Sequence, residues 1–231
     1  MKKAISLLFA ILLMTCLTIP AYAQTDNKSI VSILTDDGVD FTQLQRLFPD
    51  IALREDGFID DYTDNISAYS DSQTKQLTET HTADYINGTC NLNIYSDGSY
   101  STYGIEQILD SPISRTSTGP GYSITGSTYK AYYNMFDIGV QQGFSYTFTV
   151  SSGSGYSTIS KLSSVNVYGG IQQGYFSARS SNYVLQKQVS SSKPAEVYGD
   201  AEYYHMSYSN GTFRLISKAD RGKVSVSFTV L

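Results

Sequence analysis

The chain has 231 residues and a formal net charge of −5, from 16 basic and 21 acidic side chains. This mild negative charge argues against a nucleic acid partner, because binding to a phosphate backbone depends on clustered lysine and arginine. Twenty tyrosines, ten phenylalanines and no tryptophan indicate a mainly β protein, since aromatic residues favour half-buried strand surfaces.

Residues 1–23 have the pattern of a secretory signal peptide. A basic start, Lys2-Lys3, precedes an apolar run and the small-residue cleavage site Ala21-Tyr22-Ala23. We therefore expect cleavage after Ala23 and a secreted, extracellular protein. The apolar run is shorter than the roughly 20 residues that a membrane-spanning helix needs, so we expect no stable membrane insertion.

Residues 24–80 are interpreted as an acidic leader or linker. Between residues 24 and 110, sixteen acidic residues accompany four basic ones, a bias typical of solvated segments. Within this segment the sequence predicts a short helix over 40–48, with Asp40 as its N-cap and with Phe41, Leu44, Leu47 and Phe48 on one face. Two turns are too short to persist alone in water, so the helix must dock or remain transient. Both a removable leader and a lasting linker fit this composition.

Residues 81–231 are predicted to form one β domain. Short strands with turn signals between them indicate an all-β fold, an antiparallel β-sandwich or open barrel of about 8–10 strands. Two strands alternate clearly between apolar and hydroxyl side chains. Their predicted inward residues are Phe144, Tyr146, Phe148 and Val150 in one strand, and Val224, Val226, Phe228 and Val230 in the other.

Two hairpins are predicted from paired turn residues. Asp97-Gly98 suits a two-residue turn, which would place Tyr95 opposite Tyr100. In the same way, Asn210-Gly211 predicts a turn between two strands of the last third. Counted outward from that turn, Tyr208 faces Phe213, Met206 faces Leu215, Ser207 faces Arg214 and His205 faces Ile216.

The tripeptide Gln-Gln-Gly occurs at 141–143 and again at 172–174. A phosphate-binding loop would need glycines that lead into a helix, usually with a lysine after the last glycine. Here Phe144 and Tyr175 follow instead. We therefore interpret both copies as turns that enter strands, on corresponding edges of two sheets.

The sequence contains no clear catalytic or metal-binding pattern. Asp60, Asp61 and Asp64 could hold a weak ion, although a solvated acidic linker is the favoured explanation. His81, Cys90 and His205 are too few and too far apart in sequence for zinc. We expect a buried, inert Cys90, a structural His205, no cofactor and no enzymatic activity. A hydrolase that uses Glu196, Glu202 or His205 is the weaker alternative.

Binding is the class of function that remains. Several tyrosines and basic residues cluster in sequence, and Tyr and Arg are favoured at recognition surfaces. The candidate ligand-binding residues are Tyr168, Tyr175, Arg179, Tyr183, Tyr203 and Tyr204. The partner would be an extracellular protein, a glycan or an envelope polymer. A second interpretation is that these tyrosines fill the core of a sandwich that lacks tryptophan.

The segment 180–219, above all SSSKPAEVYGD at 190–200, resembles the closing strands of uncharacterised secreted β-sandwich proteins of Gram-positive (Firmicute) bacteria. The resemblance covers roughly Tyr129 to Phe228 and implies a sandwich fold without a known activity. SSNY followed by VYGDAEYY is also similar to secreted bacteriocins of the lactococcin 972 type, although that family is rich in tryptophan. This second likeness implies an alternative function, a membrane-active antibacterial protein restrained by its acidic leader.

Overall fold

The computed structural model describes residues 29–36, 38–60, 76–108, 126–137, 140–153, 155–170, 174–205 and 208–231. The predicted signal peptide lies outside these residues, so its cleavage stays a prediction.

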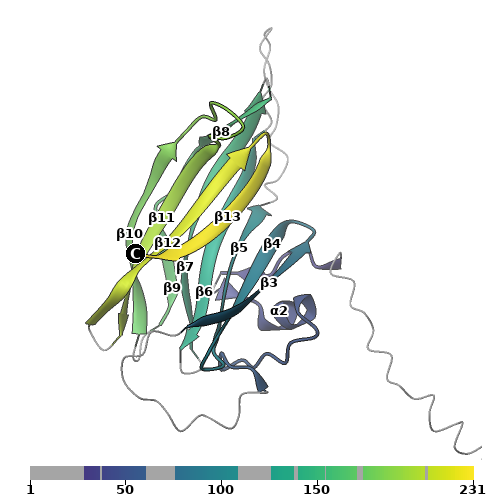
Figure 1. The fold of residues 1–231 in the computed structure, drawn as a ribbon, viewed down its shortest axis with the longest axis vertical. Helices are drawn as coiled ribbons and strands as arrows, with labels where there is room; N and C mark the ends of the chain where they lie inside the picture. Colours follow the sequence, from purple (N-terminus) through teal and green to yellow (C-terminus); the bar gives the residue numbers. More distant parts are fainter. Residues whose placement is uncertain are drawn as a thin grey trace, which may run out of the picture.

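Two antiparallel sheets dominate the fold, and their strands do not close into a barrel (Figure 1). The seven-stranded sheet has the order β3-β4-β5-β6-β7-β8, with β9 also paired to β7, and the four-stranded sheet has the order β10-β11-β12-β13. Their bounds are β3 Leu77–Tyr85, β4 Gly88–Tyr95, β5 Tyr100–Ile108, β6 Ser127–Asp137, β7 Val140–Gly153, β8 Tyr156–Ser160, β9 Asn166–Gly169, β10 Gly174–Leu185, β11 Ala195–His205, β12 Tyr208–Asp220 and β13 Lys223–Val230. The predicted all-β, sandwich-like class is confirmed, with more strands than expected.

A first core fills the space between the two sheets, where aromatic side chains from both meet. The rings of Tyr133 on β6 and Phe228 on β13 stack with centroids 4.5 Å apart. The predicted inward residues Phe144, Tyr146, Phe148 and Val150 are all buried in this core, and Val224, Val226 and Phe228 pack against it. Val230 is the exception: it ends the edge strand β13 and is 52% exposed.

A second core lies on the opposite face of the seven-stranded sheet. Successive residues of a strand point to opposite faces, so Tyr133 faces the first core while Tyr132 faces the second. Residues 30–59 cover this face as a third layer, which includes β1 (Leu34–Thr35), β2 (Gly38–Val39) and α2 (Phe41–Leu47). The layer contributes Ile30, Ile33, Val39, Leu44, Leu47, Phe48, Leu53 and Ile59, which pack with Tyr85, Cys90, Leu92, Ile94, Tyr100, Tyr132 and Phe136.

The short helix forms where the sequence predicts it. The Asp40 side chain accepts a hydrogen bond from the Gln43 N–H at 3.1 Å and so caps α2. Leu44 and Leu47 are buried beneath it, which is the docking that so short a helix requires. Figure 1 shows α2 beside β3 and β4.

The third layer differs from the loose linker expected for residues 24–80. Its apolar side chains share a core with the sheet, and the expected domain boundary at residue 80 falls inside β3. Buried apolar contacts hold this layer, because each fully buried leucine or isoleucine contributes about 1.5–3 kcal/mol. Removal of this layer after export remains an untested prediction.

Both predicted hairpin registers are wrong. In the first hairpin, Ile94 pairs with Tyr100, and the Tyr95 N–H donates to the Ser99 carbonyl at 2.9 Å. The turn therefore has three residues, 96–98, rather than two. The Gly98 N–H donates to the Tyr95 carbonyl at 2.9 Å, and Gly98 has a positive φ of 77°. A type I turn followed by a left-handed glycine produces this loop, whereas the expected turn would need a positive φ at Asp97 too.

In the second hairpin, the chain reverses between His205 and Tyr208, which pair directly. Asn210 and Gly211 lie inside β12, where the register shifts because Tyr203 pairs with Gly211 and Tyr204 with Ser209. The turn-like dipeptide therefore forms a bulge, for which the positive φ of Gly211 is suited. As a consequence, Arg214 pairs with Asp200, Leu215 with Gly199 and Ile216 with Tyr198 instead of the expected partners.

Candidate functional site

The candidate site is the outer face of the four-stranded sheet, turned away from the first core. Every second residue of β11 is buried in that core, namely Ala195, Val197, Ala201 and Tyr203. The residues between them point outward by strand alternation. We define the outer face by these side chains and their neighbours: Glu196, Tyr198, Asp200, Glu202 and Tyr204 of β11, Tyr175 and Arg179 of β10, and Arg214 and Lys218 of β12.

Arg214 is held flat on this face by two partners. Its Nε and Nη2 donate to Oδ1 and Oδ2 of Asp200, both at 2.7 Å. Its guanidinium carbon also lies 4.0 Å from the centre of the Tyr198 ring. The hydrogen bond to Asp200 raises the pKa of Arg214 above its ordinary value. The result is a planar group with one fixed orientation, because a paired fork and a stacked ring allow little rotation.

A second arginine on β10, Arg179, is paired with a carboxylate of β11. Register shifts between Ala178 and Ser180, so Arg179 is the extra residue of a bulge. Its guanidinium forms an ion pair with Glu202, whose other oxygen accepts a hydrogen bond from the Ser209 hydroxyl at 2.5 Å. Arg179 is 54% exposed at its side chain, whereas the Glu202 side chain is only 10% exposed. The Glu202 carboxylate therefore lies close to the sheet, and the Arg179 guanidinium covers it on the solvent side.

Two tyrosines complete the face next to Arg179. The rings of Tyr175 and Tyr204, which pair across β10 and β11, stack with centroids 5.2 Å apart and planes 11° from parallel. Tyr175 remains 45% exposed. At the other end of the face, Lys218 and Glu196 form an ion pair of 3.3 Å. The outer face thus combines exposed aromatic rings with charges that are paired one to one.

The structure divides the six candidate tyrosine and arginine residues into two groups. Tyr175, Arg179 and Tyr204 come together on the outer face. Tyr203 is buried against Phe176 in the first core, at 5.1 Å between ring centroids.

Tyr168 and Tyr183 also lie away from that face. Tyr183 packs against the first core, and its hydroxyl accepts from the Leu162 N–H. Tyr168 lies on β9 of the other sheet and donates to the Tyr133 carbonyl at 2.9 Å. Burial raises the pKa of Tyr168 above its ordinary value. The interpretation of these tyrosines as core residues therefore applies to Tyr203 and Tyr183, whereas Tyr168 belongs to neither core.

Sequence reasoning missed Asp200 and Arg214 as members of the site. The two residues lie 14 positions apart in sequence. The expected register placed Arg214 opposite Ser207, whereas the structure pairs it with Asp200. A signal was nevertheless present in β11, where Glu196, Tyr198, Asp200, Glu202 and Tyr204 recur at every second position. Such a polar and aromatic series, alternating with buried residues, marks the outward face of a strand.

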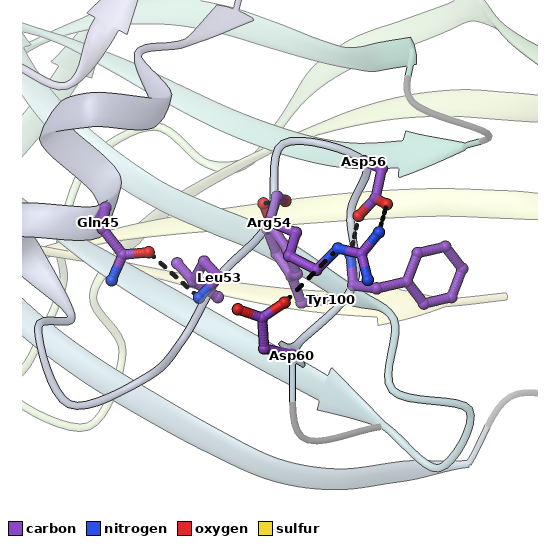
Figure 2. Close-up of polar contacts among 7 residues, drawn as sticks. Gln45, Leu53, Arg54, Asp56, Asp60 and Tyr100 are labelled. Atoms are coloured by element: carbon purple, nitrogen blue, oxygen red, sulfur yellow. Dashed lines mark hydrogen bonds and ion pairs between the residues drawn. The ribbon is translucent and has the colours of Figure 1, made fainter. Parts of the chain in front are cut away.

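The acidic loop before β3 is a structural element. Figure 2 shows Arg54 between Asp56 and Asp60; it forms an ion pair with each, that to Asp60 at 3.8 Å. The Tyr100 hydroxyl donates to the Arg54 carbonyl at 2.8 Å, which fixes the loop to β5. Asp61 and Asp64, the other members of the suggested ion site, lie outside the described residues. Within those residues, no group of three or more His, Cys, Asp or Glu could hold a metal ion.

The first Gln-Gln-Gly lies inside β7 rather than in a turn, so that part of the interpretation is wrong. A Cβ on Gly143 would lie 2.1 Å from the Tyr133 carbonyl oxygen and 2.7 Å from the Tyr168 hydroxyl. Glycine is therefore needed for the close approach of Tyr168. Gln141 donates to the Val39 carbonyl at 3.0 Å and attaches the third layer. In the second copy, Gln172 and Gln173 lie outside the described residues and Gly174 begins β10.

Cys90 is buried at 0% exposure in the second core. Burial raises the pKa of its thiol to about 12, so the nucleophilic thiolate is scarce at neutral pH. His81 is exposed, and its Nε2 forms a hydrogen bond with the Glu79 carboxylate at 3.0 Å. Neither residue is placed for nucleophilic chemistry with the other.

No helix among the described residues is long and apolar enough to cross a membrane. No family model, curated protein or solved structure matches this chain. The likeness to secreted Firmicute β-sandwich proteins therefore stays a prediction.

Proposed function

We propose that the protein is a secreted, non-enzymatic binding protein that contacts its partner through the outer face of the four-stranded sheet. The observation that carries this proposal is the guanidinium of Arg214, held flat by Asp200, together with the Arg179–Glu202 ion pair and the stacked rings of Tyr175 and Tyr204. Such groups keep one conformation before binding, so little side-chain entropy is lost when a partner arrives.

Folding alone gives little reason for these ion pairs. Asp200 and Glu202 are 6% and 8% exposed although they lie on an outward face. Burying a carboxylate is costly, and a buried ion pair is often no more stabilising than apolar residues of the same size. Serine or threonine would serve a solvent-facing strand equally well. The arrangement instead favours a role in recognition, where planar aromatic and guanidinium groups are enriched.

The charge of the face indicates the chemistry of the partner. Glu196, Asp200 and Glu202 are each paired with one base, Lys218, Arg214 and Arg179. An anionic envelope polymer would need unpaired positive charge, whereas each of these three bases already has an acidic partner. A neutral glycan fits better, because sugar rings stack on tyrosine and sugar hydroxyls accept hydrogen bonds from guanidinium groups. Binding should then depend weakly on salt.

Calorimetric titration with neutral and anionic polysaccharides of similar length tests the proposal on the chain from residue 24 onward. We expect binding to a neutral polysaccharide and a loss of at least tenfold in affinity for Tyr175→Ala, in line with losses at aromatic contact residues. Tyr156→Ala is the matched control, since Tyr156 is 39% exposed on the other sheet.

The possible results separate two failures. Equal weakening by both tyrosine variants would place binding elsewhere and overturn the proposed face. Tight binding of the anionic polymer alone would overturn the glycan assignment while the face itself still holds if Tyr175→Ala weakens that binding. Turnover of any polysaccharide would overturn the non-enzymatic role.

A further inference from the structure

Two fully buried polar side chains face each other in the second core. Thr102 on β5 and Asn134 on β6 are directly paired and both are 0% exposed. Paired residues lie on the same face of a sheet with their Cβ atoms about 4.5–5.5 Å apart. Among the described residues, neither the Thr102 hydroxyl nor either amide atom of Asn134 has a hydrogen-bond partner.

The neighbours on the same row of the sheet cannot satisfy these groups. Leu92 lies beside Thr102 on β4, and Gly143 lies beside Asn134 on β7. The Tyr168 hydroxyl above Gly143 already donates to the Tyr133 carbonyl. Buried polar groups in folded proteins almost always have a partner, which is either protein or ordered water. Three unsatisfied atoms at one place therefore point to a bound species.

The chemistry of the site defines that species. Asn134 offers one donor group and one acceptor, and Thr102 offers a hydroxyl that does either. Glu106, the next buried carboxylate along the same face of β5, is four residues and so about 13 Å from Thr102. It is already occupied by the Tyr85 hydroxyl, the Ser32 hydroxyl and the Ile33 N–H, so it brings no charge to the site. The occupant must then be small, uncharged and able both to donate and to accept. A buried water with about three hydrogen bonds meets these conditions.

The third layer closes the site. Direct hydrogen bonds attach it to the sheet on several sides, from Gln141 to the Val39 carbonyl at 3.0 Å and from Ile86 N–H to the Ile30 carbonyl at 3.0 Å. The Tyr100 hydroxyl attaches the loop at Arg54. We propose that an ordered water molecule is bound between Thr102 and Asn134 and sealed in by this layer.

Thr102→Val tests the proposal, because it removes the hydroxyl with almost no change in volume. With water bound, the variant deprives that water of a partner, and the equilibrium constant for unfolding should rise about fivefold or more. If the hydroxyl is dry and unpaired, its removal relieves a penalty and the constant should fall, which would overturn the proposal. Thr147→Val is the control. It makes the same substitution at a half-buried position of β7, away from the proposed water, and so measures the effect of replacing threonine by valine in a strand.

A crystal structure at high resolution gives an independent reading on the unaltered chain. Density for one water within hydrogen-bond distance of Asn134 and Thr102 would support the proposal. An empty, dry space would overturn it. Density for a larger molecule would overturn the assignment to water and identify the site as one for a small neutral ligand.

Discussion

Tyr132 and Tyr133 illustrate how single residues connect the three layers. They are adjacent in β6, and both are buried, but one belongs to the second core and the other to the first. Burial raises the pKa of both hydroxyls above the ordinary value. A strand whose successive side chains are both buried must lie in the middle of three layers.

The buried thiol of Cys90 gives a prediction about alkaline pH. Its pKa rises from 9.0 to about 12 in the folded protein because burial disfavours the thiolate. The unfolded chain therefore releases this proton first, and stability that is fully present below pH 9 falls as the pH rises towards 12. Cys90→Ala should remove the contribution of one titrating proton to the decrease of the free energy of unfolding with pH.

Urea unfolding at several pH values between 8 and 11 measures the effect. The tyrosines add slopes of their own, so the comparison is between Cys90→Ala and the unaltered chain. Identical pH slopes for the two proteins would contradict the assignment of a buried, neutral thiol to Cys90.

At the scale of the element, the turn after β4 tests the corrected hairpin register. Gly98 has a positive φ, and its carbonyl accepts from the Ile59 N–H at 3.0 Å. Gly98→Ala should lower the free energy of unfolding by about 1 kcal/mol, because alanine resists the left-handed conformation. Gly98→Asn should lower it less, since asparagine tolerates this conformation better.

Thermal or urea unfolding of the two variants provides the comparison. Asp97→Gly serves to distinguish the two turn types, although it also removes the Asp97 side chain that accepts from the Ser99 N–H at 3.0 Å. A gain in stability from Asp97→Gly would favour the two-residue turn over the observed one, because only that turn needs a positive φ at residue 97.

At the scale of the whole molecule, the third layer decides whether the seven-stranded sheet can exist alone. Ile33, Leu44 and Leu47 are almost fully buried against it. Their burial contributes on the order of 5 kcal/mol, which is comparable with the entire stability of a typical domain. Deletion of residues 24–60 should therefore leave a protein that unfolds below room temperature or self-associates.

Circular dichroism, gel filtration and binding of a hydrophobic dye give the readout for this deletion. A killing assay on the same deletion variant addresses the alternative function. A bacteriocin restrained by its leader should remain folded and kill related bacteria once the leader is removed. An unchanged unfolding midpoint after deletion would contradict the role we assign to the third layer.

The sequence by itself determined the elements whose signals are local. The all-β class followed from aromatic and hydroxyl alternation, and the helix at Phe41–Leu47 followed from the Asp40 cap and the spacing of Leu44 and Leu47. These signals are local because strand alternation and helix capping involve residues within a few positions of one another.

Only the tertiary structure decided the strand register and the composition of the outer face. Asn210-Gly211 suits a turn as well as a bulge, and nothing local separates the two, so the partner of Arg214 was not predictable. Likewise, the apolar face of α2 could not reveal that it would cover Tyr132 and Leu92, because burial depends on residues distant in sequence. Pairing and layer order are set by long-range packing, where a strand's neighbours are chosen by the fit of whole faces.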